Sequence, residues 1–357
     1  MNDDETKNTD VSVIVITKNN AYTIQRCITG LLNQNYPKNR YEIVFVDGHS
    51  VDGTRESIEK YSQAQGSPLV KLYYENVGTM GYARNLGISK AQGKILVFTD
   101  GDAYPTDNWL REIVQLFNTN RDLAIAGGLD VLIPQDSTHT GISSWRRLKR
   151  YTGIKAASKM KTVNLAILKD VAVAFNGFDP TLSHFDESEL MARLYFRGNV
   201  KNILFDPQIT VFHERKMSSL SDRIEKLFKK SVIGVPTLLK KHMVKMALTC
   251  PVSTIGTSMF FIIANLFSIP FLILVILGII PYCIPILLAT IGLVSILVYS
   301  GNIMRSIRKF LPGIFFVLTL DCIVRFFGTF FGMLSWAYVA LTRKWRPIVV
   351  QESLRKQ

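Results

Sequence analysis

The sequence predicts an α/β domain with a mostly parallel sheet, followed by helices at a membrane surface and by a transmembrane helical region. Apolar runs alternate with helix-like segments over residues 11–100, which is typical of parallel strands joined by helical crossovers. Aspartates follow two of these runs, where open α/β sheets bind their ligands. Residues 251–300 and 312–341 are almost free of charge, and stretches of about 20 apolar residues are candidate membrane spans.

The chain has 357 residues and a net charge of +14, which is enough for one α/β domain and a further region. The polar tail, residues 1–10, does not resemble a signal peptide, so we expect the domain after it to stay in the cytoplasm. Basic side chains gather in residues 145–161 and 215–245, and such segments beside a membrane are attracted to anionic lipid. We expect no nucleic-acid partner, because no motif that reads nucleic acid is present.

The first strand is predicted at Val11–Ile16 and is followed by a polar turn and a helix over Tyr22–Asn33. The second strand, Tyr41–Val46, leads into Asp47. Ser50 or Asp52 would cap the next helix.

The third strand is predicted at Val70–Tyr74, a helix at Gly81–Lys90 and the fourth strand at Lys94–Thr99. The fourth strand ends in Asp100-Gly101-Asp102. Two aspartates this close repel each other unless a cation lies between them, and a divalent ion takes carboxylates together with substrate phosphates. The alternative is a turn that is merely rich in aspartate.

After residue 123 the pattern is less regular, with strands expected at 123–128 and 162–168 and a helix at 185–196. No GxGxxG follows the first strand and no GxxxxGK[ST] occurs, which argues against dehydrogenases and P-loop ATPases. A nucleotide bound to this sheet would be held by carboxylates, a cationic side chain and a metal ion.

Several ordered motifs between residues 11 and 215 resemble those of the family 2 glycosyltransferases, which have the GT-A fold. They are Thr17-x-Asn19, Val46-Asp47-Gly48-His49-Ser50-Val51-Asp52-Gly53-Thr54, Gly81-Tyr82-Ala83-Arg84-Asn85-Leu86-Gly87-Ile88, Asp100-Gly101-Asp102, Asn164, Gly177-Phe178-Asp179 and Asp186-Glu187-Ser188-Glu189-Leu190. The resemblance implies a Rossmann-like, mostly parallel sheet with helices on both faces. Gly48 and His49 depart from the commoner family pattern.

The resemblance also implies a binding site for a nucleotide-diphosphate sugar. The residues it assigns to the donor are Thr17, Asn19, Asp47, Arg84 and Asp100. Asp102, Asp100 and His213 would hold a divalent metal ion, Mg²⁺ or Mn²⁺. The alternatives are a helix cap for Asp47, a surface ion pair for Arg84 and a structural role for His213.

Family 2 enzymes invert the anomeric centre, so a base must face the acceptor. The resemblance places Glu187 in that role, with Asp186 beside it. The alternative is that these acids only stabilise the start of a helix through its dipole.

The predicted organisation is a polar tail (1–10), a GT-A catalytic domain (11–213), amphipathic interfacial helices (214–250), a transmembrane region with three or four spans (251–342) and a basic C-terminal tail (343–357). This indicates a multi-pass membrane protein with a cytoplasmic catalytic domain.

The function predicted is that of an inverting glycosyltransferase of the hexosyltransferase class, acting on a hydroxyl of a lipid-linked or membrane-associated saccharide. One alternative is a synthase that glycosylates a polyprenyl phosphate. Another is a non-catalytic membrane protein that binds nucleotide. The QxxRW motif of processive synthases is absent, so we expect transfer of single sugars.

Overall fold

The computed structural model describes residues 9–64, 66–134, 149–182, 184–215, 225 and 237–250. The chain divides into two compact units, and the described residues up to 215 belong to the first. Residues 1–8 of the predicted N-terminal tail, the predicted spans at 251–342 and the predicted C-terminal tail lie outside the described residues. Within the part that is described, no helix has both the length and the apolar character needed to cross a membrane.

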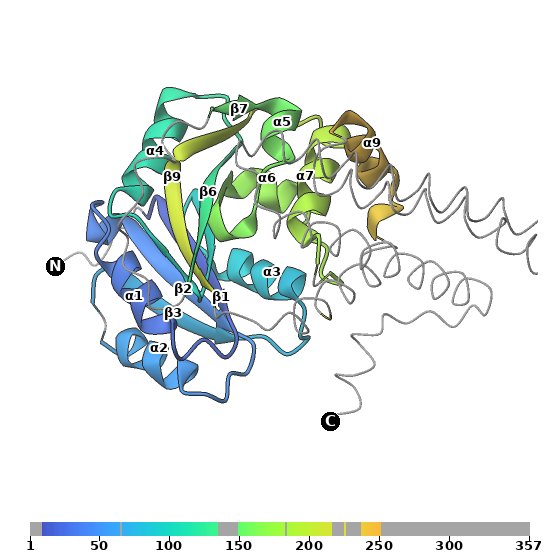
Figure 1. Cartoon of the computed structure of the whole chain (residues 1–357). Coiled ribbons are helices and arrows are strands. Elements are labelled where there is room, and N and C mark those ends of the chain that lie inside the picture. The colour runs from blue at the N-terminus through green and yellow to red at the C-terminus, as the bar shows by residue number, and fades with distance from the viewer. Residues whose placement is uncertain are drawn as a thin grey trace, which may run out of the picture. The chain divides into compact units, whose positions relative to one another are not determined.

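The first half of the domain alternates strands and helices, as predicted (Figure 1). Its elements are β1 (Val11–Thr17), α1 (Ile24–Leu32), the 3-10 helix η1 (Lys38–Arg40), β2 (Tyr41–Asp47), α2 (Thr54–Ser62), β3 (Leu69–Tyr74), α3 (Met80–Lys90) and β4 (Ile95–Asp100).

The second half contains shorter and less regular elements. They are β5 (Ala103–Pro105), α4 (Trp109–Thr119), β6 (Ile125–Pro134), β7 (Tyr151–Thr152), α5 (Gly153–Ala157), the 3-10 helix η3 (Thr162–Asn164), β8 (Leu165–Leu168), α6 (Lys169–Ala174), α7 (Asp186–Phe196) and β9 (Ile203–Arg215). The strand expected at 162–168 therefore begins as a 3-10 helix. In the second unit, α9 spans Lys241–Thr249.

The described strands form one mixed sheet in the order β3-β2-β1-β4-β8-β6-β9-β5, with β7 paired to β9. Strands β3, β2, β1 and β4 are parallel, and β6 is parallel to β9. The pairs of β8 with β4 and β6, and of β9 with β5 and β7, are antiparallel. The predicted parallel sheet is confirmed for the first half, whereas the second half is mixed.

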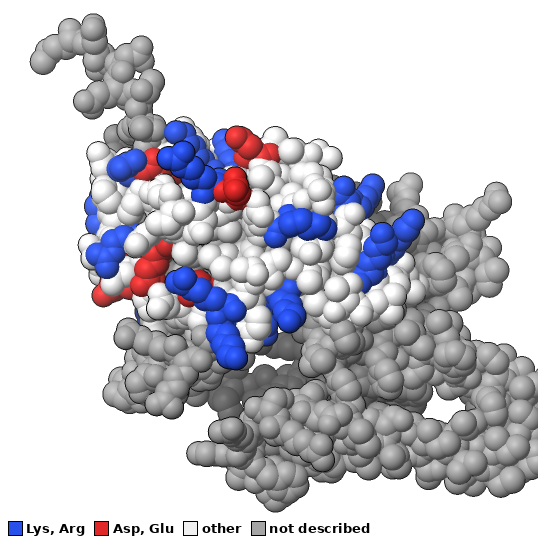
Figure 2. All heavy atoms as spheres, turned by 90° about the horizontal axis from the view of Figure 1, so that it is seen from above, with Lys and Arg blue, Asp and Glu red and all other residues white. Residues whose placement is uncertain are grey.

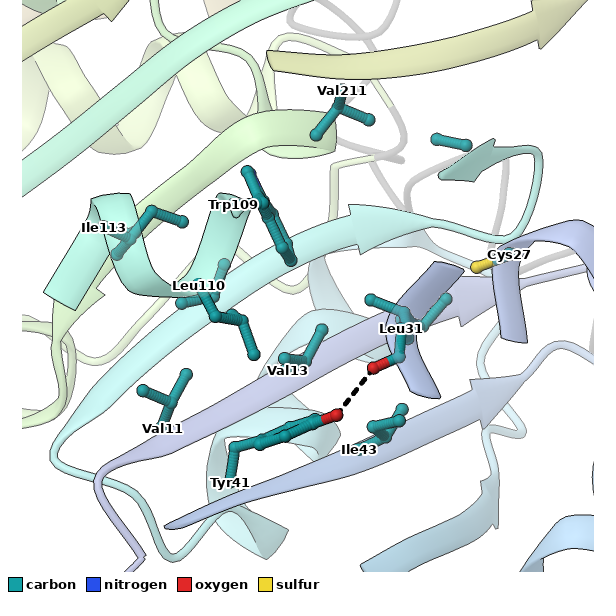
Figure 3. Close-up of a cluster of buried hydrophobic side chains, with 14 of the residues drawn as sticks. Val11, Val13, Cys27, Leu31, Tyr41, Ile43, Trp109, Leu110, Ile113 and Val211 are labelled. Carbon is teal, nitrogen blue, oxygen red and sulfur yellow. Dashed lines mark hydrogen bonds between the residues drawn. The ribbon is translucent and has the colours of Figure 1, made fainter. Parts of the chain in front are cut away.

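One face of the sheet is covered by α1, α2 and α4, which bury a single apolar cluster against it (Figure 3). Val11 and Val13 of β1 point into this cluster because alternate residues of a strand face the same side. Trp109 is the largest side chain in it and is fully buried. The Tyr41 hydroxyl donates to the Leu31 carbonyl oxygen at 2.8 Å, which joins β2 to α1.

The opposite face is covered by α3, which lies so close to β1 that a Cβ on Gly87 would meet Ile14 Cγ2 at 2.4 Å. Phe98 of β4 packs edge-on against Phe178, with ring centroids 5.3 Å apart. Helices therefore cover both faces of the sheet, as predicted. This packing brings the start of α3 and the segment before α7 to the same side of the sheet.

The parallel strands end together. Thr17 at the end of β1 is in register with Asp47 of β2, and Ile16 is in register with Asp100 of β4. Two aspartates singled out by the sequence therefore flank the carboxyl end of the same strand.

Basic and acidic side chains are interspersed on the face shown in Figure 2. In that view the Lys and Arg side chains lie in separate groups, with uncharged surface between them.

Candidate active site

Asp47 ends β2 and is completely buried. Its carboxylate accepts hydrogen bonds from the Ser50 hydroxyl and, at 2.8 Å, from the Ser50 backbone N–H. The helix α2 begins after Gly53, whose φ of 94° favours glycine. Asp52 accepts from the Thr54 N–H at 3.2 Å and from its hydroxyl at 2.6 Å. Asp47 thus holds the turn after β2. The prediction that Ser50 or Asp52 caps α2 is wrong, because the N-cap is Gly53 and within α2 Asp52 bonds only Thr54, at the first helical position.

The loops after β1 and β2 are hydrogen-bonded to each other. The Asn19 N–H donates to Ser50 Oγ at 2.9 Å, and Asn19 Oδ1 accepts from the Val51 N–H at 3.0 Å. Thr17 Oγ1 donates to Asn20 Oδ1 at 3.0 Å. Thr17 and Asn19 therefore stand at the same edge of the sheet as Asp47, and their predicted contact with a donor stays a prediction.

The turn Asp100-Gly101-Asp102 lies tightly against the loop after β1. The Gly101 N–H donates to the Ile16 carbonyl at 3.0 Å, and Thr23 Oγ1 donates to the Gly101 carbonyl at 3.1 Å. A Cβ at Gly101 would lie 2.8 Å from Thr17 Oγ1. Glycine between the two aspartates is therefore required by close packing.

His213 on β9 lies beside Asp102. Its Nε2 is 3.2 Å from Asp102 Oδ1, and its Nδ1 is 3.1 Å from Asp130 Oδ1. Burial disfavours the imidazolium, but the hydrogen bonds to both carboxylates outweigh burial and raise the pKa of His213 to about 9. The pKa of Asp130 falls to about 2: burial opposes this, but His213 and Lys161 stabilise the carboxylate.

One ligand atom from each of Asp100, Asp102 and His213 lies within 4.8 Å of the other two. Carboxylate oxygens and an imidazole nitrogen are a suitable donor set for a divalent ion such as Mn²⁺. Asp100 Oδ1 is buried and makes no hydrogen bond within the described chain. Burial, with the charge of Asp102 adding to it, raises the pKa of Asp100 to about 6 despite Arg84 nearby. A cation between these groups would pair with the unbonded oxygen of Asp100 and stabilise its negative charge. The three predicted metal ligands therefore fit a divalent ion.

Arg84 is buried in α3, with 3% of its side chain exposed. Its Nη1 donates to Asp186 Oδ2, and its Nη2 is 3.6 Å from Asp100 Oδ1. The guanidinium carbon is 5.6 Å from the centroid of the Phe178 ring. Arg84 is therefore the cation that lies between the two acidic groups, and it does not form the surface ion pair considered as the alternative.

Asp186 and Glu187 begin α7. Burial, the negative charge of Asp186 and a hydrogen bond with Asp186 raise the pKa of Glu187 to about 7. Asp186 itself is buried and paired with Arg84. The first turn of α7 thus offers one carboxylate that is held by an arginine and a second one that titrates near neutral pH.

Three other residues of the quoted motifs have structural contacts. Asn85 donates to the Phe178 carbonyl and accepts from the Phe178 N–H, both at 2.8 Å. Asn164 accepts from the Trp109 indole at 2.9 Å and donates to the carbonyls of Leu129 and Ile209. Glu189 is bonded to Arg193 one turn on. These three side chains hold elements together.

Asp130 was not identified from the sequence, and Lys161 was assigned only to the basic segment 145–161. Asp130 Oδ2 lies 2.8 Å from Lys161 Nζ, so the two residues extend the polar cluster beyond His213. The available signal was a lone acid inside the apolar run Ile125–Pro134. A buried acid in such a run needs a partner, and the sequence does not say which one.

Comparison with known proteins agrees with this geometry. Residues 12–167 match the family model described as Glycosyl transferase family 2. The solved structure of the mannosyltransferase PcManGT from Pyrobaculum calidifontis, in complex with GDP-Man and Mn²⁺, is similar with a TM-score of 0.51 and 17% identity, over 94% of this chain and 88% of that one. Residues 12–167 are therefore similar to the family 2 glycosyltransferases, and the described α/β domain shares the GT-A-like fold of that mannosyltransferase.

Two curated relatives are similar to part of this chain. The Glycosyltransferase AglE of Haloferax volcanii is 35% identical over 163 residues, which are 45% of this chain and 53% of the relative. A Methanococcus voltae protein is 31% identical over 107 residues, which are 30% of this chain and 33% of the relative. It is named dolichyl N-acetyl-alpha-D-glucosaminyl phosphate 3-beta-D-2,3-diacetamido-2,3-dideoxy-beta-D-glucuronosyltransferase. The matches thus span about half of the first relative and a third of the second.

Proposed function

We propose that this chain is an inverting glycosyltransferase that moves a sugar from a nucleotide-diphosphate donor to a hydroxyl of a lipid-linked or membrane-associated saccharide. The observation that carries the proposal is Arg84, which contacts Asp100 and Asp186. Through it the candidate metal ligands and the candidate base belong to one site. Direct displacement needs such an arrangement, since the nucleotide leaves from one side of the sugar and the acceptor enters from the other.

On the acceptor side, Glu187 would take the proton from the attacking hydroxyl. A pKa of about 7 suits a general base at neutral pH. Asp186, fixed by Arg84, would keep the start of α7 in place and add negative charge beside Glu187.

On the donor side, Asp47, Thr17 and Asn19 surround the end of β1, where a nucleoside would meet hydrogen-bonding groups. Asp100, Asp102 and His213 would hold the divalent ion. That ion, Mn²⁺ or Mg²⁺, would supply positive charge to the diphosphate that leaves. The nitrogen ligand favours Mn²⁺ over Mg²⁺.

The choice between the two classes of acceptor depends on whether the reaction needs a general base. A polyprenyl phosphate is already ionised and needs no proton acceptor, whereas a sugar hydroxyl does. The Methanococcus voltae relative carries a dolichyl-linked sugar phosphate in its name, which supports a lipid-linked saccharide. The predicted spans at 251–342, the basic segments and the cytoplasmic position of the domain belong to the same proposal and rest on the sequence.

The test compares Glu187→Gln with Glu189→Gln, which makes the same charge change two residues further on. Purified full-length protein is given Mn²⁺ and a panel of UDP-, GDP- and dTDP-sugars, and release of nucleoside diphosphate is measured with and without lipid-linked saccharide. Glu187→Gln should lower kcat by about 10²–10⁴-fold while donor affinity, measured by calorimetry, is retained. Glu189→Gln should keep a kcat near wild type in the folded protein, with a loss of stability, because Arg193 donates to both Glu189 oxygens and an amide offers only one acceptor. Full activity of Glu187→Gln would favour the polyprenyl phosphate alternative, and no turnover with any donor would favour the non-catalytic one.

A further inference from the structure

We infer that Asp130 is a positioning residue for the candidate metal site, where it holds His213 with Nε2 directed at Asp102. The inference rests on the proposed function, because it concerns the same three metal ligands. Asp130 does not itself belong to that ligand set.

The sheet places Asp130 next to His213. Strands β6 and β9 are parallel, with Asp130 in register with Val211 and Leu132 in register with His213. Asp130 therefore lies two residues before Leu132, which is paired with His213. Residues two apart on a strand face the same side of the sheet, so Asp130 and His213 lie on one face. Its carboxylate, 4% exposed, reaches across to His213 Nδ1 at 3.1 Å.

The contact with Asp130 determines which nitrogen of His213 could bind a metal ion. A histidine that binds a metal ion keeps one N–H and uses the lone pair of its other nitrogen. Asp130 accepts at Nδ1 and would keep the N–H there, so Nε2 is the nitrogen that would give up its proton to a metal ion. Nε2 is the atom that faces Asp102 Oδ1, at 3.2 Å. Partners of this kind fix the tautomer and the ring orientation of a metal-binding histidine.

Lys161 completes the arrangement from the surface. Its ammonium lies 2.8 Å from Asp130 Oδ2, so the two oxygens of Asp130 have separate partners. Lys161 therefore restrains the rotation of the Asp130 carboxylate. Oδ1 is then the atom left for His213.

A purely structural ion pair is the competing explanation, and the chain contains a matched example. Asp206 on β9 is also a buried carboxylate, 3% exposed, and is paired with a surface cation, Arg150, at 2.6 Å. It also accepts from the Gln208 N–H at 3.0 Å. Asp206 and Asp130 thus share burial and an ion pair but differ in the histidine contact.

The experiment measures Mn²⁺ alone binding to purified full-length protein, by electron paramagnetic resonance of the free ion. Asp130→Ala should weaken binding by about 10–100-fold, and Asp130→Asn should fall between this variant and wild type. Asp206→Ala and Asp206→Asn should match wild type. His213→Ala should also weaken binding, and adding Asp130→Ala to it should change nothing further, because Asp130 acts only through His213.

Equal Mn²⁺ affinity in wild type and Asp130→Ala would overturn the inference and leave the proposed metal site intact. An equal loss in the Asp130 and Asp206 variants would also overturn it, because the effect would then be general destabilisation. Absence of Mn²⁺ binding by wild type, with or without nucleoside diphosphate, would instead remove the metal from the proposed function. If thermal unfolding shows that Asp130→Ala does not fold, the Mn²⁺ affinities of Asp130→Asn and Asp206→Asn are compared instead. Equal affinities of these two variants would refute the positioning role of Asp130.

Discussion

Arg84 connects the two halves of the site because its guanidinium is fully desolvated between carboxylates of different elements. The charge would be costly to bury alone, and Asp186 and Asp100 compensate for it. The same pairing holds Asp186 at the start of α7, next to Glu187. A single side chain on α3 thus keeps the donor-side and acceptor-side acids in one place.

Arg84→Met should lower the free energy of unfolding by about 3–5 kcal/mol, since Asp186 would remain buried without a cation. Urea unfolding at neutral pH measures this. In the double variant Arg84→Met/Asp186→Asn no unpaired charge is left at this position, so part of the loss should be recovered. A double variant that is less stable than Arg84→Met would contradict the assigned ion pair.

The pH dependence of transfer should follow Glu187. Its pKa is raised to about 7, so the carboxyl keeps its proton below that pH and cannot accept another. The value of kcat/KM should therefore be constant at higher pH and fall about tenfold per unit as the pH drops below the pKa. The profile is measured with saturating Mn²⁺. A profile that stays flat below pH 7 would show that no such base is used, as expected for a phosphate acceptor.

At the scale of elements, the apolar runs predicted β1, β2 and β4 because these strands are buried on both faces, whereas β3 lies at the edge of the sheet and is only partly buried. Helix α4 was missed although its apolar residues recur on one face, at Trp109, Leu110, Ile113 and Phe117. The short strands β5 and β7 have too few residues for any period to show. Their pairing with β9 depends on contacts between distant parts of the chain, which local pattern does not contain.

The sequence predicts those site residues that lie at the ends of parallel strands. Asp47 and Asp100 follow apolar runs, and register alone brings them to the end of β1. Asp130 was not predictable, because its role arises from the pairing of β6 with β9. Asn164 was singled out only as part of a motif that resembles those of family 2, and the fold surrounds it with Trp109 and two backbone carbonyls.

Asn164→Ala tests that structural role. It removes three hydrogen bonds that join η3 to α4, β6 and β9, and it leaves buried polar groups without partners. At about 1–3 kcal/mol for each unsatisfied group, the free energy of unfolding should fall by several kcal/mol in urea titration. The KM values for donor and acceptor should be unchanged in the folded protein. A raised acceptor KM with normal stability would instead support a role in acceptor binding.

At the scale of the whole molecule, every proposed site residue lies between Thr17 and His213, within the first compact unit. We propose that the second unit contributes to this function by attaching the enzyme to a membrane, as the apolar stretches at 251–342 predict. A lipid-linked acceptor is confined to two dimensions, so an enzyme held at the same surface meets it at a higher local concentration.

Attachment through spans and attachment through surface helices alone predict different behaviour. Residues 251–342 contain stretches long enough to cross a bilayer, whereas the basic segment before them would bind lipid headgroups electrostatically. The full-length protein should stay in the membrane pellet after washes with concentrated salt and with alkaline carbonate, and detergent should release it. Salt screens the attraction to headgroups and carbonate strips peripheral proteins, but neither extracts an apolar span. Release by either wash would exclude spans at 251–342 and leave a peripheral enzyme.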